Sequence, residues 1–290
     1  MRKKISEILL STPSILWMSI FFLIPLIFII AISFRPSDIM GGIGSGWTLQ
    51  TWRTIGNPNY PDIIVRTLWI SAATAVICVF LALPCAYAMA RMTLRWRNVM
   101  TTLIVLPFWT SFLIRVFAWR ILLHPDGMVK HILVFLKLST PDAMLLYNSW
   151  AILLVSVYTF LPFAILPIYA SAEKFDFSLI EAARDLGAKG TRAFMSVFVP
   201  GVRQGVVSAI LMVFIPALGS YVIPDLVGGP DTELIGNKIA QRTFVDRNLP
   251  HAAALSTLVT AGVLLFLTLW VFYSRYQAKR TAEGREGLFS

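Results

Sequence analysis

Six long apolar stretches, none of which contains Asp or Glu, constrain the fold of this 290-residue chain more than any other feature. A helix needs about 20 predominantly apolar residues to cross roughly 30 Å of hydrocarbon, because its backbone polar groups must be satisfied within the segment. The predicted spans are residues 14–34, 67–90, 99–122, 146–172, 202–223 and 251–273. The sequence therefore predicts an all-α, polytopic membrane protein with six transmembrane helices.

The composition agrees with a bilayer environment. Hydrophobic side chains make up 57% of the chain and charged ones 14%, whereas soluble domains average about 45 to 50% apolar residues. Two cysteines, Cys78 and Cys85, lie in one apolar segment, so we interpret them as core residues and not as a disulfide scaffold. Prolines interrupt several spans, so kinked helices are expected, above all in the fourth span, which contains Pro162 and Pro167.

The basic residues predict the orientation. Six spans place both termini on one side, and cytoplasmic loops of membrane proteins carry an excess of Lys and Arg. An arrangement with both termini inside gives 15 basic residues in the inner segments and eight in the outer ones. We therefore predict one transmembrane domain over residues 1–290, with an inner loop at 173–200 and outer loops at 35–66, 123–145 and 224–250. The net charge of +10 needs no nucleic acid partner.

The sequence lacks the residues that several classes of protein require for their function. Ion-coupled carriers place carboxylates within the bilayer, but the predicted spans contain no acid, and His124, His131 and His251 are expected in outer loops or at a span end. No phosphate-binding loop, catalytic triad or zinc motif is present. The chain is therefore expected to be a transport subunit and not an enzyme, with no cofactor of its own and no metal site, so any energy must come from a partner.

The loop between spans four and five predicts a short helix with both ends specified. Ser178 and Glu181 have the spacing of a capping box, and Gly187 suits the left-handed residue that ends a helix. Leu179, Ala183 and Leu186 share one face. Isolated helices shorter than about 12 to 15 residues are marginal in water. The helix therefore either packs on its own spans or enters a groove of another protein, with Glu181 as its cap or as a contact to that protein.

This loop also carries a resemblance. Glu181-Ala182-Ala183, Gly187 and Val197-Phe198-Val199-Pro200 resemble the signature of ABC importer permeases, with valines where Ile and Leu are more usual. The resemblance implies the type I importer permease fold and a coupling helix that docks into a nucleotide-binding subunit. The implied coupling residues are Leu179, Ile180, Glu181, Ala182, Ala183, Leu186 and Gly187.

Other segments resemble the spermidine/putrescine branch of these permeases, namely residues 107–119, 219–230 and 235–237. The resemblance implies a bacterial inner membrane subunit that works with two ATP-binding cassette subunits, a second, homologous permease and a periplasmic or surface solute-binding protein. ATP and Mg would then be bound by the ATPase partner. Amino acid derivatives, phosphonate, ferric ion and thiamine stay open as cargo. A self-contained secondary carrier is the alternative from another class.

A polyamine cargo would favour aromatic faces and a carboxylate. The candidates are Trp109, Tyr158, Tyr221 and Asp225. Aromatic residues are also common at membrane interfaces, so a purely structural role stays open for each of them. Arg115 and Arg120 in the third span would suit an anionic cargo if they face the path. The other interpretation is that they approach the outer interface or pair with Asp225 or another outer carboxylate.

Overall fold

The computed structural model describes the chain except residues 1–10, 39–40, 57–58, 139 and 287–290. The described part is helical, and its single β contact is an isolated bridge between Ser37 and Ile43. The chain forms two compact units. Unit 1 contains Met1–Tyr60 and Lys238–Ser290, and unit 2 contains Pro61–Asn237. The N-terminal Arg2, Lys3 and Lys4, which contributed to the predicted orientation, lie outside the described residues.

Four helices are long and apolar enough to cross a membrane by themselves. They cover Ser11–Ser33, Tyr60–Arg91, Ser149–Ala172 and Leu249–Leu269. Two further apolar pairs are bent, Leu94–Trp109 with Phe112–Leu122 by 90° and Gly190–Gly201 with Arg203–Leu218 by 74°. The six predicted spans are therefore recovered when each bent pair counts as one span.

The first bend lies within the predicted span 99–122, and the second falls at Val202, the first residue of the predicted span 202–223. The first break falls at Thr110, whose backbone is extended after the 3₁₀ turn η2 (Leu106–Trp109). Pro107 is the second residue of this turn, and proline has no amide hydrogen to continue a helical ladder. The predicted bend of the fourth span does not break the helix, because α8 (Ser149–Ala172) continues through Pro162 and Pro167.

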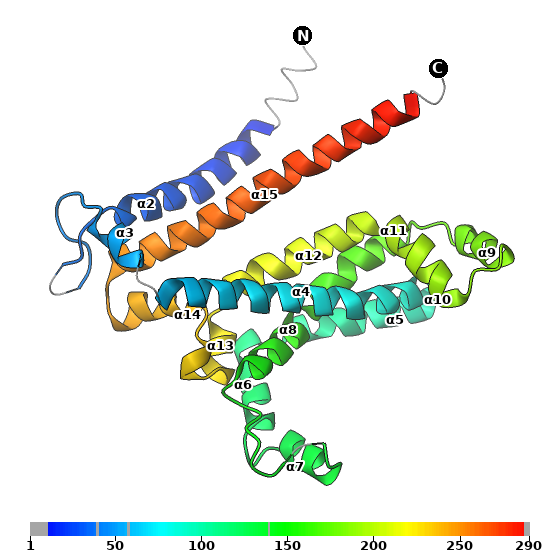
Figure 1. Ribbon diagram of the computed structural model, residues 1–290, viewed down its shortest axis with the longest axis horizontal. Helices are drawn as coiled ribbons and strands as arrows, with labels where there is room; N and C mark the ends of the chain where they lie inside the picture. Colours follow the sequence, from blue (N-terminus) through cyan, green and yellow to red (C-terminus); the bar gives the residue numbers. More distant parts are fainter. Residues whose placement is uncertain (1–10, 39–40, 57–58, 139, 287–290) are drawn as a thin grey trace. The chain divides into compact units, whose positions relative to one another are not determined.

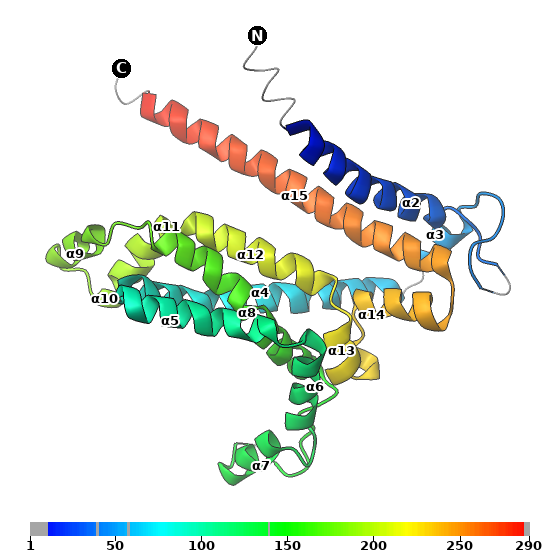
Figure 2. The ribbon, with the colours of Figure 1, turned by 180° about the vertical axis from the view of Figure 1, so that it is seen from behind.

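Unit 1 brings the two ends of the chain together. Its helices are η1 (Ser19–Leu23), α2 (Ile24–Ser33), α3 (Gln50–Ile55), η5 (Gln241–Val245) and α15 (Leu249–Glu286). Helix α2 lies along α15 in both views (Figures 1 and 2). The side chains of Trp17, Phe21, Phe22 and Phe28 remain at least 60% exposed. Such an apolar exterior suits lipid contact.

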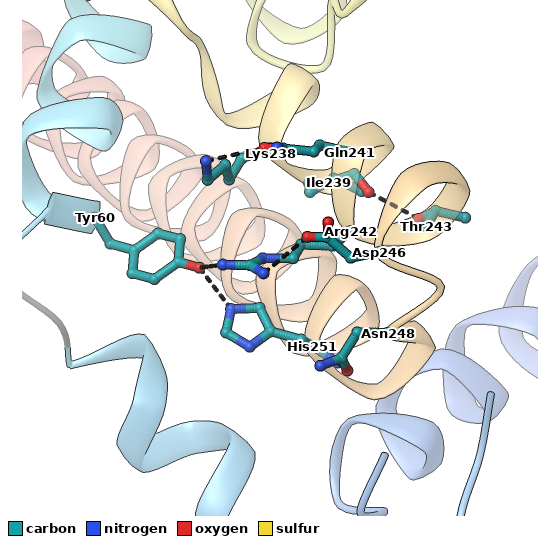
Figure 3. A network of polar contacts seen from close by, with 9 residues as sticks. All are labelled: Tyr60, Lys238, Ile239, Gln241, Arg242, Thr243, Asp246, Asn248 and His251. Carbon is teal, nitrogen blue, oxygen red and sulfur yellow. Dashed lines mark hydrogen bonds and ion pairs between the residues drawn. The ribbon is translucent and has the colours of Figure 1, made fainter. Parts of the chain in front are cut away.

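A polar network closes unit 1 beside α15 (Figure 3). The Tyr60 hydroxyl lies 2.6 Å from Nε2 of His251 and accepts a 3.4 Å hydrogen bond from Nη2 of Arg242. Arg242 also pairs with Asp246 at 2.8 Å. Tyr60 and His251 are 5% and 8% exposed. His251 lies at the end of a span, as the sequence predicts, but its side chain is buried, because Tyr60 from the start of α4 (Asn59–Arg91) covers it.

Unit 2 contains the remaining helices. They are α4, α5 (Leu94–Val105), η2, α6 (Phe112–Leu122), α7 (Met128–Phe135), α8, α9 (Ser178–Asp185), α10 (Gly190–Ala193), η3 (Phe194–Phe198), α11 (Val199–Gly201), α12 (Arg203–Leu218), α13 (Val222–Val227) and η4 (Pro230–Thr232). The helix α14 (Ile235–Ala240) crosses into unit 1.

Helices α8 and α12 pack closely against each other in unit 2. At Gly205 of α12, an added Cβ would lie 2.7 Å from the carbonyl oxygen of Pro167, so only glycine allows this approach. Ile152, Ile168 and Val213 are fully buried. Of the two cysteines predicted in the core, Cys78 is fully buried and Cys85 is half-buried against the core. Within unit 2, α9 lies at one end of the long helices, and α6, α7 and α13 lie at the other (Figures 1 and 2).

Candidate functional site

Helix α9 stands on a cluster of five aromatic rings, which we call the aromatic base. Its members are Tyr87 of α4, Phe175 and Phe177 after α8, and Phe194 and Phe198 of η3. The ring centroids of Phe198 and Tyr87 are 4.9 Å apart, and those of Phe198 and Phe175 are 5.4 Å apart. Both pairs are edge-to-face, the geometry that the ring quadrupoles favour. The base therefore joins α4, the end of α8 and η3.

The backbone around the base is shaped to admit these rings. At Gly201, an added Cβ would lie 2.3 Å from the ring of Phe175. The π-helical segment η3 sets Phe194 and Phe198 in a stacked pair, with centroids 5.3 Å apart. Single π-helical turns are rare and occur often at functional sites. Phe198, which lies between the two valines of the signature, is fully buried.

The N-terminus of α9 differs from the prediction. No side chain caps the helix as a capping box would, and Phe177 occupies the N-cap position. Instead, Oδ1 of Asp176 accepts a 3.0 Å hydrogen bond from the amide of Ser178. The side chain and the backbone of Ser178 both lower the pKa of Asp176. The capping box of Ser178 and Glu181 is therefore wrong, because Asp176 satisfies the entering turn and Glu181 is left exposed.

The C-terminus of α9 ends as the sequence predicts. Gly187 has a φ of 87°, in the left-handed region that favours glycine. Its amide donates to the Arg184 carbonyl at 2.9 Å, and the amide of Ala188 donates to the Ala183 carbonyl at 3.0 Å. This pair of bonds is a Schellman motif, which satisfies the last carbonyls of the helix.

The two faces of α9 have different roles. Ile180 is 4% exposed and packs into the core, and Ala183 is half-buried against it. On the outer face, Leu179 is 51% exposed and Leu186 is 90% exposed. Ala182 and Glu181 are also exposed. One face of the helix therefore packs on the core of its own chain, and the opposite face exposes a small apolar surface.

The candidates for a cargo path do not form one cluster. Tyr221 and Asp225 lie one turn apart, linked by a 3.0 Å hydrogen bond from the amide of Asp225 to the carbonyl of Tyr221, and both are exposed. Tyr158 is 40% exposed and makes an edge-to-face contact of 5.3 Å with Trp119. Trp109 is 79% exposed in η2. No aromatic contact is found between Trp109 and either tyrosine in the described part of the chain.

Arg115 and Arg120 form no ion pair with a described carboxylate. The expected pairing with Asp225 is therefore not found. The guanidinium of Arg115 lies 5.9 Å from the ring centroid of Phe108, and its Nε is buried without a hydrogen-bond partner. Both arginines lie on α6, which meets the preceding helix at a bend of 90°.

Sequence reasoning missed the aromatic base. The signal was present, since Phe175, Phe177, Phe194 and Phe198 bracket the predicted helix in sequence. Tyr87 could not be found this way, because it comes from α4 and only the fold brings it to the loop.

Comparison with known proteins decides the family. The family described as "Binding-protein-dependent transport system inner membrane component" matches residues 79–282. The chain belongs to this family. This permease is therefore a multi-pass inner membrane component of an ABC importer, and such components serve transport and are not enzymes. The family name also specifies that a binding protein takes part.

The permease is similar over most of its length to curated relatives. It is 33% identical to the spermidine/putrescine transport system permease protein PotB of Haemophilus influenzae, covering 89% of each chain. It is 31% identical to PotB of Escherichia coli, covering 89% of this chain and 93% of that one. It is also 33% identical to the inner membrane ABC transporter permease protein YdcU of Escherichia coli, covering 76% and 74%.

Solved structures agree with the fold. The permease superposes on a chain of a bacterial ABC transporter involved in the import of the acidic polysaccharide alginate, with a TM-score of 0.65 and 17% identity. The match covers 94% of this chain and 96% of that chain. A second structure of the alginate transporter, in complex with a pentasaccharide-bound periplasmic protein, gives a TM-score of 0.66. At this identity the likeness supports the fold alone.

Proposed function

We propose that α9 is the coupling helix of an ATP-driven importer and docks into a nucleotide-binding subunit. The observation that carries this proposal is the division of the helix, with Ile180 buried and Leu179 and Leu186 exposed. An amphipathic helix that lays its apolar face into a groove is a common mode of protein recognition. The exposed Ala182 permits close approach of a partner surface, and Glu181 is available for a basic group.

The aromatic base provides a route by which a displacement of α9 is transmitted to the membrane helices. It packs rings from α4, from the end of α8 and from η3 into one cluster. Close-packed interiors transmit displacement because they have little free volume. Movement of the docked helix would therefore shift these helices together, as alternating access by rigid-body motion requires.

The proposed assembly contains two ATP-binding cassette subunits, a second permease subunit that is homologous to this one, and a periplasmic or surface solute-binding protein. ATP and Mg bind to the cassette subunits in this proposal. The sequence of the permease supports this division, since it contains no phosphate-binding loop.

The proposed cargo is a polyamine, spermidine or putrescine. The supporting observations are the names of the PotB relatives and the similarity over about nine tenths of the chain. The exposed Tyr221 and Asp225 would offer an aromatic face and a carboxylate to an ammonium group. Trp109 and Tyr158 are the further candidates, and their separation suggests that the second permease would complete any binding site.

The coupling proposal is tested with Leu186→Asp in the reconstituted transporter. A charge on this exposed residue would leave folding unchanged but would oppose burial in an apolar cleft. We expect loss of ATPase copurification and of vanadate-sensitive uptake. Leu138→Asp is the matched control, because Leu138 is 73% exposed and lies outside α9. Normal uptake by Leu186→Asp would reject docking through this face.

The cargo proposal is tested by titrating the cognate binding protein with polyamines, amino acids, phosphonate, ferric ion and thiamine. We expect saturable binding of spermidine or putrescine, and uptake of the same solute by the reconstituted complex. Tight binding of an anion, with no response to polyamines, would exclude this cargo and direct attention to Arg115.

A further inference from the structure

Unit 2 has a groove that contains neither the coupling residues nor the cargo candidates. It lies between α4 and α8 and has a volume of about 630 Å³. The lining residues are Arg66, Trp69, Ile70, Ala72, Ala73, Val76, Ile77, Ser149, Trp150 and Leu153. Both tryptophans are exposed, Trp69 by 71% and Trp150 by 77%. The groove therefore offers its aromatic rings and aliphatic side chains to whatever surrounds the helices.

The lining residues are ordered by depth along α4. Arg66 comes first, then Trp69, then the small Ala72 and Ala73, and then the aliphatic Val76 and Ile77. At 1.5 Å per residue, the distance along the helix from residue 66 to residue 77 is about 16 Å. Half of a hydrocarbon core of roughly 30 Å is about 15 Å. The groove therefore has the length of one membrane leaflet, with its positive charge at one end.

Helix α8 adds residues of the same kinds at the same depths. The two helices run in the same direction (Figure 1), and Sγ of Cys78 meets the Val157 carbonyl at 3.6 Å. Counting back seven residues along each helix places Trp150 level with Ser71, and thus close in depth to Trp69. Two tryptophans at one depth are typical of the membrane interface, where the ring meets the headgroups.

The charged end of the groove is suited to an anion. Arg66 makes one weak hydrogen bond, 3.4 Å from Nη1 to the Glu233 carbonyl, and no ion pair with a described carboxylate. Ser149 lies in the first turn of α8, where Asn148 caps the amide of Ala151. The amides of a helix N-terminus carry partial positive charge. A guanidinium, a hydroxyl and this helix end therefore lie at the headgroup level.

We propose that this groove binds an anionic phospholipid. The phosphate lies at Arg66 and Ser149, the glycerol region lies between Trp69 and Trp150, and one acyl chain follows Ala72, Ala73 and Val76. Contact with a second membrane protein would not require charge, interfacial aromatic, small and aliphatic residues to follow one another in this order over one leaflet. The order matches the cross-section of a phospholipid itself.

The experiment compares phospholipids retained by the full chain, purified with its copurifying subunits and exchanged into nanodiscs of phosphatidylcholine with a quarter phosphatidylglycerol. Native mass spectrometry counts the bound lipid. Wild-type protein should retain phosphatidylglycerol over phosphatidylcholine. Arg66→Gln should lower this retention about fivefold, the effect of one basic residue near an anionic surface, and Arg66→Lys should restore most of it.

Groove filling provides an independent variant. Ala73→Phe should displace the acyl chain and lower retention of both lipids, whereas Ala88→Phe, at an exposed position of α4 outside the groove, should not. Arg53→Gln is the control for loss of an exposed positive charge. Inorganic phosphate should not compete, because it has no acyl chain.

Two results would overturn the proposal. Equal retention by wild type, Arg66→Gln and Ala73→Phe would show that the groove holds no specific lipid. Efficient crosslinking of Val76→Cys to another subunit, in membranes, would show that protein covers the groove instead. Crosslinking of the same cysteine to a photoreactive phosphatidylglycerol would support the lipid.

Discussion

Gly187 determines how α9 ends, and its effect comes from the backbone alone. Its φ is 87°, and an added Cβ would meet no atom within 4 Å. A side chain there is therefore strained by the left-handed conformation, at a cost of at least about 1 to 2 kcal/mol, and not by a clash. Gly187→Val should insert normally but reduce uptake per ATP hydrolysed, measured in proteoliposomes.

The matched control for this variant is Gly190→Ala. Its added Cβ would have an ordinary contact of 3.6 Å with Arg184, without a positive φ. Coupling should be unchanged in the control. Wild-type coupling in Gly187→Val would show that the end of α9 does not matter for transport.

Asp176 gives the start of α9 a predictable pH dependence. Hydrogen bonds from the side chain and amide of Ser178 lower the pKa of Asp176. A lowered pKa in the folded state stabilises the turn above the ordinary carboxyl range, and this contribution is lost as pH falls through the lowered pKa. Amide exchange in residues 178–182 should therefore show faster local opening, after correction for intrinsic rates, as pH falls from about 6 to 3.

The variant Asp176→Asn should remove most of this dependence, since its side chain does not titrate. Asp185→Asn, at the other end of α9, should keep it. An unchanged profile in Asp176→Asn would assign the dependence to another group.

At the scale of elements, the aromatic base and the exposed face of α9 should contribute very differently to the stability of the fold. Phe198→Ala removes a fully buried ring and should cost about 3 to 5 kcal/mol, as large-to-small core substitutions do. Leu186→Ala removes a side chain that is 90% exposed and should leave stability within about 0.5 kcal/mol. Thermal unfolding in detergent measures both, and equal destabilisation by the two variants would contradict this division.

The elements also show what the sequence could predict. The existence of α9, its end at Gly187 and the apolar spans follow from local chemistry, that is, from glycine at a left-handed position and from long uncharged runs. The angles of the two bends and the cap at Asp176 could not be read in this way. Hydropathy has no direction, so it cannot distinguish a straight span from two helices that meet at 90°. The cargo path and the role of α9 in docking stay predictions.

At the scale of the whole molecule, the network of Tyr60, Arg242 and His251 closes a unit made from both ends of the sequence. Tyr60→Phe would leave the buried His251 nitrogen without its partner, at a cost of about 1 to 3 kcal/mol. We expect a lower unfolding temperature and faster proteolysis of unit 1. Tyr147→Phe, at a side chain that is 47% exposed, is the control and should have no effect. Equal unfolding temperatures for the two variants would show that the network does not stabilise the fold.

The pairing of α2 with α15 also imposes an order on biosynthesis. About 200 residues separate the two helices, and ribosomes add roughly 5 to 20 residues per second. Helix α2 therefore spends some 10 to 40 seconds in the membrane before its partner is made, and most of its span stays exposed even afterwards. During that interval the insertion machinery or lipid has to shelter it. A ribosome that stalls before α15 leaves an orphaned helix, which quality-control proteases could recognise.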